Sequence, residues 1–301
     1  MIHIHDLPLV KVGLRLKKKY HLKLVADMHE NWPALLQISK HIKTISGRIV
    51  SPLCMWRKYE KNVLIKADKV IVVIDEAKTR LNKLGVDNNK IHIVSNTINY
   101  KELDLKTPLT VHKETILYYA GGINRHRGLQ HVIQAMHKTN NPLLKFWIIG
   151  EGSYKHELMK LIKDLGLNHQ IEFFGFLPFQ QMMDKLMSAD FALIPHLKTQ
   201  HTDSTIPNKL FQYMYAGKPV IASDCIPIRR ILEETNSGIV YPSEDTDFLA
   251  DIFLKLTELD VHDMAMNGKK AVIEKYNWEN DSNNLVKMYT EISHEKFSAD
   301  N

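Results

Sequence analysis

The chain of 301 residues is 44% hydrophobic and 25% charged, which is ordinary for a soluble globular protein of one large or two medium domains. No apolar run approaches the roughly 18–20 residues of a membrane span, and no secretory signal pattern opens the sequence, so we expect neither an integral membrane protein nor an exported one. Two cysteines, Cys54 and Cys225, lie far apart without metal-ligand spacing. We therefore predict a cytoplasmic protein in a reducing compartment.

The net charge of +6 is unevenly distributed along the chain. Residues 1–105 hold 19 Lys and Arg against 10 Asp and Glu, and part of the excess lies in the helical segment from Lys11 to Lys23. Such a basic helix is most often a solvated surface, but it can also lie on anionic lipid or nucleic acid. Peripheral contact with the inner face of an anionic membrane therefore stays open.

Strands and helices alternate along the first third of the chain. Apolar and β-branched runs predict strands at residues 2–5, 23–28, 70–74 and 90–95, and helical periodicity predicts helices at 8–19, 33–39, 52–66 and 76–84. Residues 100–115 are polar, contain Pro108 and are interpreted as a linker.

A longer set of the same kind follows the linker. Strands are predicted at 116–120, 145–149, 171–174, 191–195, 220–223 and 238–241, and helices at 129–138, 154–165, 179–188, 208–216, 228–235 and 246–256. Two more helices, at 261–275 and 278–293, complete the chain. This pattern predicts an α/β protein with two Rossmann-like, doubly wound parallel sheets.

The predicted domains are unequal in size. Residues 1–106 would form an N-terminal domain, residues 107–275 a complete second domain, and residues 276–301 a helix that packs back toward the first. The first domain has about four strands and begins in the middle of an α/β pattern, so we expect its opening strands to be missing through truncation.

The segment 202–223 combines a loop, a helix and a buried strand. Ser204 or Thr205 is predicted to cap the helix, Pro207 suits its first turn, and Gly217 with Pro219 ends it. A helix start can bind a phosphate group, and Lys209 and Asn208 would stand beside it. The alternative is an ordinary capped helix with a solvated lysine.

The motifs of the second half occur in the order found in group 1 glycosyltransferases (glycosyltransferase family 4, GT-B fold), and the chain resembles that family over nearly its whole length. The matching segments are 119–129 (YAGGINRHRGL), 147–152 (WIIGEG), 171–176 (IEFFGF), 188–195 (SADFALIP), 207–219 (PNKLFQYMYAGKP) and 276–278 (YNW). In the first half, residues 3–6 (HIHD) and 25–30 (VADMHE) are similar to late parts of the family's N-terminal domain.

The resemblance implies a retaining, metal-independent hexosyltransferase without a cofactor, which uses a nucleotide-diphosphate sugar as donor and a glycan or glycolipid as acceptor in surface polysaccharide or lipopolysaccharide biosynthesis. The donor would bind the second domain and the acceptor the cleft between domains. His29 matches the family's active-site histidine, which would hydrogen-bond the transferred sugar. By the same resemblance the loop with Phe176 lies near the nucleobase.

Residue chemistry agrees with a donor site at strand ends. Two glycines that let the backbone approach a ligand follow one strand, and two cations, Arg127 and Lys209, could stabilise the diphosphate as it leaves. The predicted catalytic residues are His29, Arg127 and Lys209, and the predicted donor contacts are Gly121, Gly122, Arg125, Glu151, Phe176, Ser204, Thr205, Asn208 and Gln212.

The chain departs from the family pattern at several positions. Ser204 and Gln212 stand where most members have two glutamates, and Gly122 stands where a basic residue is common. Neutral Gln212 would hold a ribose hydroxyl less tightly than a carboxylate. The glycine-rich loop that follows the family's first strand is absent from the sequence, so a nucleotide-binding homologue with weak or no activity is an alternative.

Two further alternatives belong to other classes. Another GT-B enzyme, such as a sugar-nucleotide epimerase, has the same fold, and fold does not determine function. A nucleic-acid binder is suggested by the sequence pI of about 9.0, but aromatic residues do not alternate with the basic ones and no reading motif is present, so no nucleic-acid partner is predicted.

Overall fold

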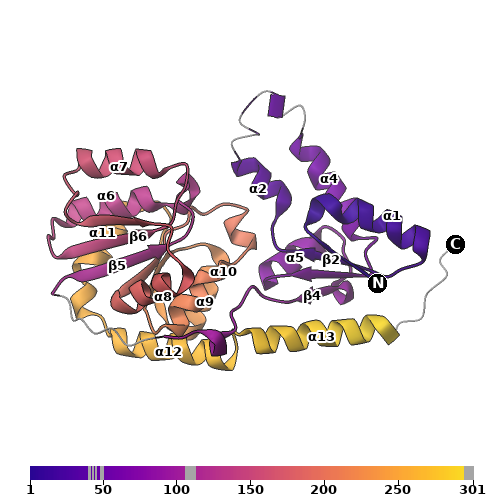
Figure 1. The fold of residues 1–301 in the computed structure, drawn as a ribbon. Helices are drawn as coiled ribbons and strands as arrows, with labels where there is room; N and C mark the ends of the chain where they lie inside the picture. The colour runs from indigo at the N-terminus through magenta and orange to yellow at the C-terminus, as the bar shows by residue number, and fades with distance from the viewer. Residues whose placement is uncertain (40–41, 43, 45, 48–50, 106–112, 295–301) are drawn as a thin grey trace. The chain divides into compact units, whose positions relative to one another are not determined.

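The computed structural model describes residues 1–39, 42, 44, 46–47, 51–105 and 113–294, and two compact units contain them (Figure 1). The first unit comprises Met1–Thr97, Thr199–Pro207 and Trp278–Asn301, and the second comprises Ile98–Lys198 and Asn208–Asn277. Each unit is built on its own parallel sheet, which confirms the predicted α/β class. The linker predicted at residues 100–115 begins with a short 3-10 turn, Tyr100–Glu102, and its residues 106–112 lie outside the described part.

The first unit has four parallel strands in the order β1-β2-β3-β4. Its strands are β1 (Ile2–His5), β2 (Leu24–Met28), β3 (Lys69–Val72) and β4 (Ile91–Ile93), and its helices include α1 (Val10–Tyr20), α2 (Trp32–Ile38), α4 (Leu53–Leu64) and α5 (Asp75–Lys83). All five residues of β2 are buried, as expected of a central strand in a parallel sheet. The register places His5 of β1 beside Asp27 of β2.

The last helix, α13 (Trp278–His294), belongs to the first unit. Its buried residues Met288 and Ile292 pack on Val25, Ile71 and Val94. At its start, Asp281 accepts hydrogen bonds from the Thr97 hydroxyl and, at 3.1 Å, from the backbone N–H of Ser95. Apolar packing and buried hydrogen bonds therefore hold α13 on the sheet.

The second unit has six parallel strands in the order β10-β9-β8-β5-β6-β7. The strands are β5 (Thr115–Ala120), β6 (Leu144–Ile149), β7 (Ile171–Gly175), β8 (Phe191–Ile194), β9 (Val220–Ser223) and β10 (Gly238–Tyr241). The order reverses at β5, between β8 and β6, and such a switch point opens a ligand crevice at the carboxyl ends of the strands.

Helices cover both faces of this second sheet (Figure 1). On one face α6 (Leu129–Thr139), α7 (Lys155–Asp164) and α11 (Thr246–Leu254) bury their apolar residues against the strands. The remaining helices are α8 (Phe179–Ser188), α9 (Lys209–Tyr215), α10 (Ile226–Thr235) and α12 (Val261–Glu274). The Tyr213 hydroxyl of α9 accepts a hydrogen bond of 3.0 Å from the N–H of Ala120, which anchors α9 at the end of β5.

The predicted cap of the helix at 208–216 is wrong. Residues Thr202–Ser204 form a separate 3-10 turn, and α9 begins only at Lys209, without a side-chain cap from Asn208. The Ser204 hydroxyl instead donates to the Gln200 carbonyl, and the Thr205 hydroxyl donates to the His29 carbonyl at 3.3 Å. The end of the helix is as predicted, because Gly217 has a φ of +66°.

Candidate functional site

The carboxyl end of β5 holds a lysine against the backbone. Lys209, the first residue of α9, donates from its ammonium group to the Ala120 carbonyl, and its Nζ lies 4.1 Å from the centre of the Tyr119 ring. A Cβ on Gly121 would stand 2.5 Å from this Nζ, and Gly121 has a φ of +144°. Only glycine at position 121 therefore leaves room for the lysine in this place.

Arg127 lies in the next turn and brings a second cation to the same strand end. Its Nη1 is 3.1 Å from Nε2 of His196, whereas its buried Nε has no hydrogen-bond partner within the described chain. The 3-10 turn Arg125–Arg127 ends at Gly128, where a Cβ would stand 1.7 Å from the Pro195 carbonyl oxygen. The backbone that follows β8 (Phe191–Ile194) therefore leaves no room for a side chain at position 128.

Arg127 is close enough for its positive charge to influence the pKa values of Lys209 and Tyr119. Burial, and after it the positive charge of Arg127, hold the pKa of Lys209 well below its ordinary value. Burial raises the pKa of Tyr119 to about 12, and the charge of Arg127 opposes that rise. Among the described residues no carboxylate pairs with Arg127 or Lys209. An anion bound here would supply the missing negative charge.

The other predicted donor contacts of the second unit are less closely grouped. Gly122 and Arg125 are exposed, and so is Asn208 at the start of α9, while Gln212 is half-buried. Glu151 forms an ion pair of 2.7 Å with Lys155. The Phe176 side chain, after β7, is 84% exposed. The structure thus brings Gly121, Arg127 and Lys209 together and leaves the remaining contacts as predictions.

Ser204 and Thr205 lie in the first unit. The Ser204 hydroxyl also accepts a hydrogen bond of 3.1 Å from the Asn31 amide. With Thr205 bonded to the His29 backbone, both hydroxyls are engaged by residues of the first unit. Their predicted role as donor contacts remains a prediction.

His29 belongs to a cluster around Asp27 that the sequence analysis missed. Nε2 of His29 lies 3.2 Å from Oδ2 of Asp27, and His3 and His5 approach the same oxygen. Hydrogen bonding to Asp27 raises the pKa of His29. Burial would raise the pKa of Asp27, but hydrogen bonds from His29 and His3 outweigh it and the pKa falls well below its ordinary value. The alternation His3, His5 on one strand and Asp27, His29 on the next was the available signal.

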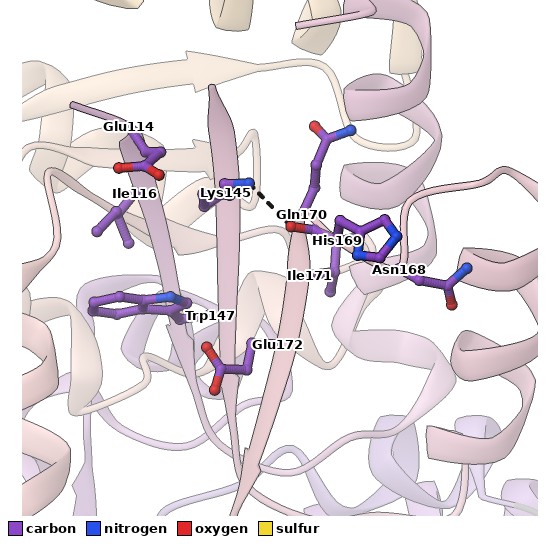
Figure 2. Close-up of a pocket in the computed structure, with 9 residues that line it drawn as sticks. All are labelled: Glu114, Ile116, Lys145, Trp147, Asn168, His169, Gln170, Ile171 and Glu172. Atoms are coloured by element: carbon purple, nitrogen blue, oxygen red, sulfur yellow. Dashed lines mark hydrogen bonds between the residues drawn. The ribbon is translucent and has the colours of Figure 1, made fainter. Parts of the chain in front are cut away.

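A pocket of about 340 Å³ opens at the amino ends of β5, β6 and β7 (Figure 2). Figure 2 shows Lys145 donating to the His169 carbonyl, over 3.0 Å, with Trp147 and Glu172 further along the strands. The pocket lies at the edge of the sheet opposite to Gly121, because Gly121 follows the carboxyl end of β5. We therefore do not assign donor binding to this pocket.

Comparison with known protein families gives the class of the chain. Residues 101–272 match the model described as "Glycosyl transferases group 1", and residues 1–102 match the model described as "Glycosyltransferase Family 4". The first match spans more than half of the chain. The chain therefore belongs to the group 1 glycosyl transferases.

Individual relatives agree with this family. An uncharacterized glycosyltransferase of Methanocaldococcus jannaschii is 24% identical over 96% of this chain and 74% of its own length. The amylovoran biosynthesis glycosyltransferase of Erwinia amylovora is 27% identical over 66% of this chain and 50% of its own length. The chain thus spans half of the second relative and about three quarters of the first.

Solved structures confirm the GT-B fold. Sucrose-phosphate synthase from Thermosynechococcus elongatus superposes with a TM-score of 0.79 at 18% identity, covering 97% of this chain and 73% of that one. The Anabaena protein HepE, solved in complex with UDP, gives a TM-score of 0.80 at 15% identity over 96% of this chain and 78% of its own. At these identities the likeness concerns the fold alone.

Proposed function

We propose that this chain is a retaining, metal-independent glycosyltransferase that moves a sugar from a nucleotide-diphosphate sugar to a glycan or glycolipid acceptor. The supporting observation is the pair Arg127 and Lys209, two cations without a carboxylate partner in the described chain, at the carboxyl end of β5. Breaking the bond between sugar and diphosphate leaves negative charge on the phosphate oxygens. Cations fixed beside those oxygens stabilise the transition state more than the ground state.

The relatives support a role in polysaccharide or glycoconjugate biosynthesis. One is named for amylovoran biosynthesis, and another, from Escherichia coli, carries a putative assignment to colanic acid biosynthesis. HepE has also been solved with UDP-glucose. In our proposal His29 hydrogen-bonds a hydroxyl of the transferred sugar. The donor is contacted by Gly121, Gly122, Arg125, Glu151, Phe176, Ser204, Thr205, Asn208 and Gln212.

The test is calorimetric titration of the full chain with UDP and GDP, combined with assays of sugar transfer and donor hydrolysis. Binding of one nucleotide together with turnover of its sugar conjugate is the expected result. Nucleotide binding without any turnover would mean a nucleotide-binding homologue rather than an enzyme. Failure to bind either nucleotide would remove the proposed donor site.

Gly121→Ala should weaken nucleotide binding by displacing Lys209. The new Cβ would stand 2.5 Å from Nζ, at a backbone φ of +144° that side chains rarely adopt. Gly166→Ala is the matched control, because Gly166 has a φ of +72° and a Cβ there would meet nothing within 4 Å. Both variants should lose about 1–3 kcal/mol of stability through backbone strain. Only Gly121→Ala should also lose affinity for UDP or GDP, by at least 10-fold in calorimetry.

We also propose that α1 touches anionic lipid. Leu9, immediately before the helix, and Val12, Leu16 and Tyr20 on it recur three or four residues apart, and their exposed fractions are 57%, 47%, 36% and 55%. Basic residues such as Lys11 and Lys19 are exposed beside this apolar stripe. No helix among the described residues is long and apolar enough to cross a membrane, so the contact would be peripheral.

Co-sedimentation with phospholipid vesicles tests this contact. Vesicles containing phosphatidylserine should retain the protein at low salt, and phosphatidylcholine vesicles should not, because each basic residue near an anionic surface contributes about 1 kcal/mol. Lys19→Glu should weaken retention about 10-fold or more, whereas Lys163→Glu, an exposed lysine of α7 in the second unit, should not. Equal retention on both vesicle types would exclude the electrostatic contact.

A further inference from the structure

Three imidazoles converge on one carboxylate oxygen in the first unit. Nε2 of His3, Nδ1 of His5 and Nε2 of His29 lie 3.0, 3.1 and 3.2 Å from Oδ2 of Asp27. The other oxygen of this carboxylate, Oδ1, is buried and has no hydrogen-bond partner among the described residues. All three ring nitrogens therefore lie near Oδ2, although Oδ1 of the same carboxylate accepts no hydrogen bond from the described residues.

Hydrogen bonding alone does not account for this arrangement. A carboxylate oxygen offers two lone pairs, so it cannot accept three well-formed hydrogen bonds. At least one of the three ring nitrogens must therefore be near this oxygen for a reason other than a hydrogen bond to it, such as a shared partner. Two atoms that each bind one zinc ion at about 2.0–2.1 Å, with a tetrahedral angle between them, stand about 3.3 Å apart. The distances of 3.0 and 3.1 Å from Asp27 to His3 and His5 are close to that value.

We propose that His3, His5 and Asp27 bind a divalent transition-metal ion of the zinc type. Their three ligand atoms all lie within 4.8 Å of one another. Two imidazoles and one carboxylate suit zinc or cobalt better than magnesium or calcium, which prefer oxygen ligands. The His5 side chain is 67% exposed, so an ion can enter from solvent and keep water as a further ligand.

The backbone and a neighbouring helix orient these ligands. His3 and His5 project from the same side of β1, and the parallel register sets His5 directly beside Asp27. Nδ1 of His3 is hydrogen-bonded to the Tyr289 hydroxyl of α13. When Nδ1 carries the proton and donates it to this oxygen, the lone pair of Nε2 faces Asp27, and a partner of this kind commonly orients a metal-binding histidine.

The proposed metal ligands belong to the first unit, whereas the Arg127–Lys209 pair, which neutralises phosphate in the proposed reaction, belongs to the second. A metal ion bound there would engage Asp27, whose Oδ2 also lies 3.2 Å from Nε2 of His29. The proposal does not depend on the function proposed above, because metal binding is measured without donor or acceptor.

The test is titration of the chelator-treated full chain with Zn²⁺ by calorimetry, and with Co²⁺ by visible absorption. One ion per chain should bind, and His5→Ala should weaken that binding at least 100-fold. Tyr289→Phe should weaken it about 10- to 100-fold by removing the hydrogen bond to His3. His156→Ala, an exposed histidine of α7, is the matched control and should leave the affinity unchanged.

Asp27→Asn separates this site from metal capture by the chain terminus or by scattered histidines, since neither needs that carboxylate. Circular dichroism confirms that each variant is folded, and exposed His5 offers the safest substitution. Equal zinc affinity in the parent, His5→Ala and Asp27→Asn proteins would overturn the proposal. Absence of zinc binding to the parent chain would overturn it as well.

Discussion

Lys209→Met lowers the rate of sugar transfer about 10²- to 10³-fold, and Arg127→Ala has an effect of the same size. Removing one group that stabilises developing negative charge typically costs about 2.7–4 kcal/mol of barrier. Methionine keeps the length of the lysine side chain over the Tyr119 ring but carries no charge. The measurement is kcat with saturating donor, so that a change in donor affinity does not enter the result.

Binding measurements show whether these variants act through phosphate. Both should lose affinity for UDP and retain affinity for uridine, because only the nucleotide carries the diphosphate. Lys163→Met is the matched control, since this lysine is exposed on α7 and should change neither property. Equal losses for UDP and uridine would indicate a collapsed site, and parental rates in both variants would refute the role of the cations.

The regular elements could be predicted because their apolar patterns are local. The strands Ile2–His5, Val220–Ser223 and Gly238–Tyr241 and the helix Phe179–Ser188 have the predicted bounds, and the other elements differ by a few residues at their ends. A central strand of a parallel sheet is buried on both faces, so its sequence is a short apolar run. Such a run is visible without any knowledge of its neighbours.

The features that the sequence did not predict correctly are contacts between residues that are distant in the chain. Ser204 has the composition of a helix cap, but its hydroxyl is engaged by Gln200 and by Asn31, 173 residues earlier. The contact of Asp27 with His5 can be recognised only once the register of β1 on β2 is known. The cations Arg127 and Lys209 were proposed from the family resemblance and from their places at predicted helix starts, beyond the carboxyl ends of the strands, where parallel sheets gather ligand-binding residues. The direction in which each side chain points, and the residue that it contacts, could be determined only from the folded structure.

Arg80→Ala destabilises the first unit by about 3–5 kcal/mol, the usual cost of leaving a buried charge without its partner. The guanidinium of Arg80 on α5 donates two hydrogen bonds, of 2.9 and 2.8 Å, to the carboxylate of Glu60 on α4. Only 3% of the Glu60 side chain is exposed, so water cannot replace the arginine. Urea unfolding followed by tryptophan fluorescence measures the change, since Trp56 lies on the same helix as Glu60.

A double variant separates the charge from the contact. Arg80→Met combined with Glu60→Met removes both charges and keeps apolar volume, so it should recover most of the stability that Arg80→Ala loses. Lys155→Ala, which breaks the exposed pair with Glu151, should cost no more than about 1 kcal/mol. If the double variant were as unstable as Arg80→Ala, the loss would come from packing between α4 and α5 rather than from an unpaired carboxylate. The ion pair then would not be the main link between these two helices.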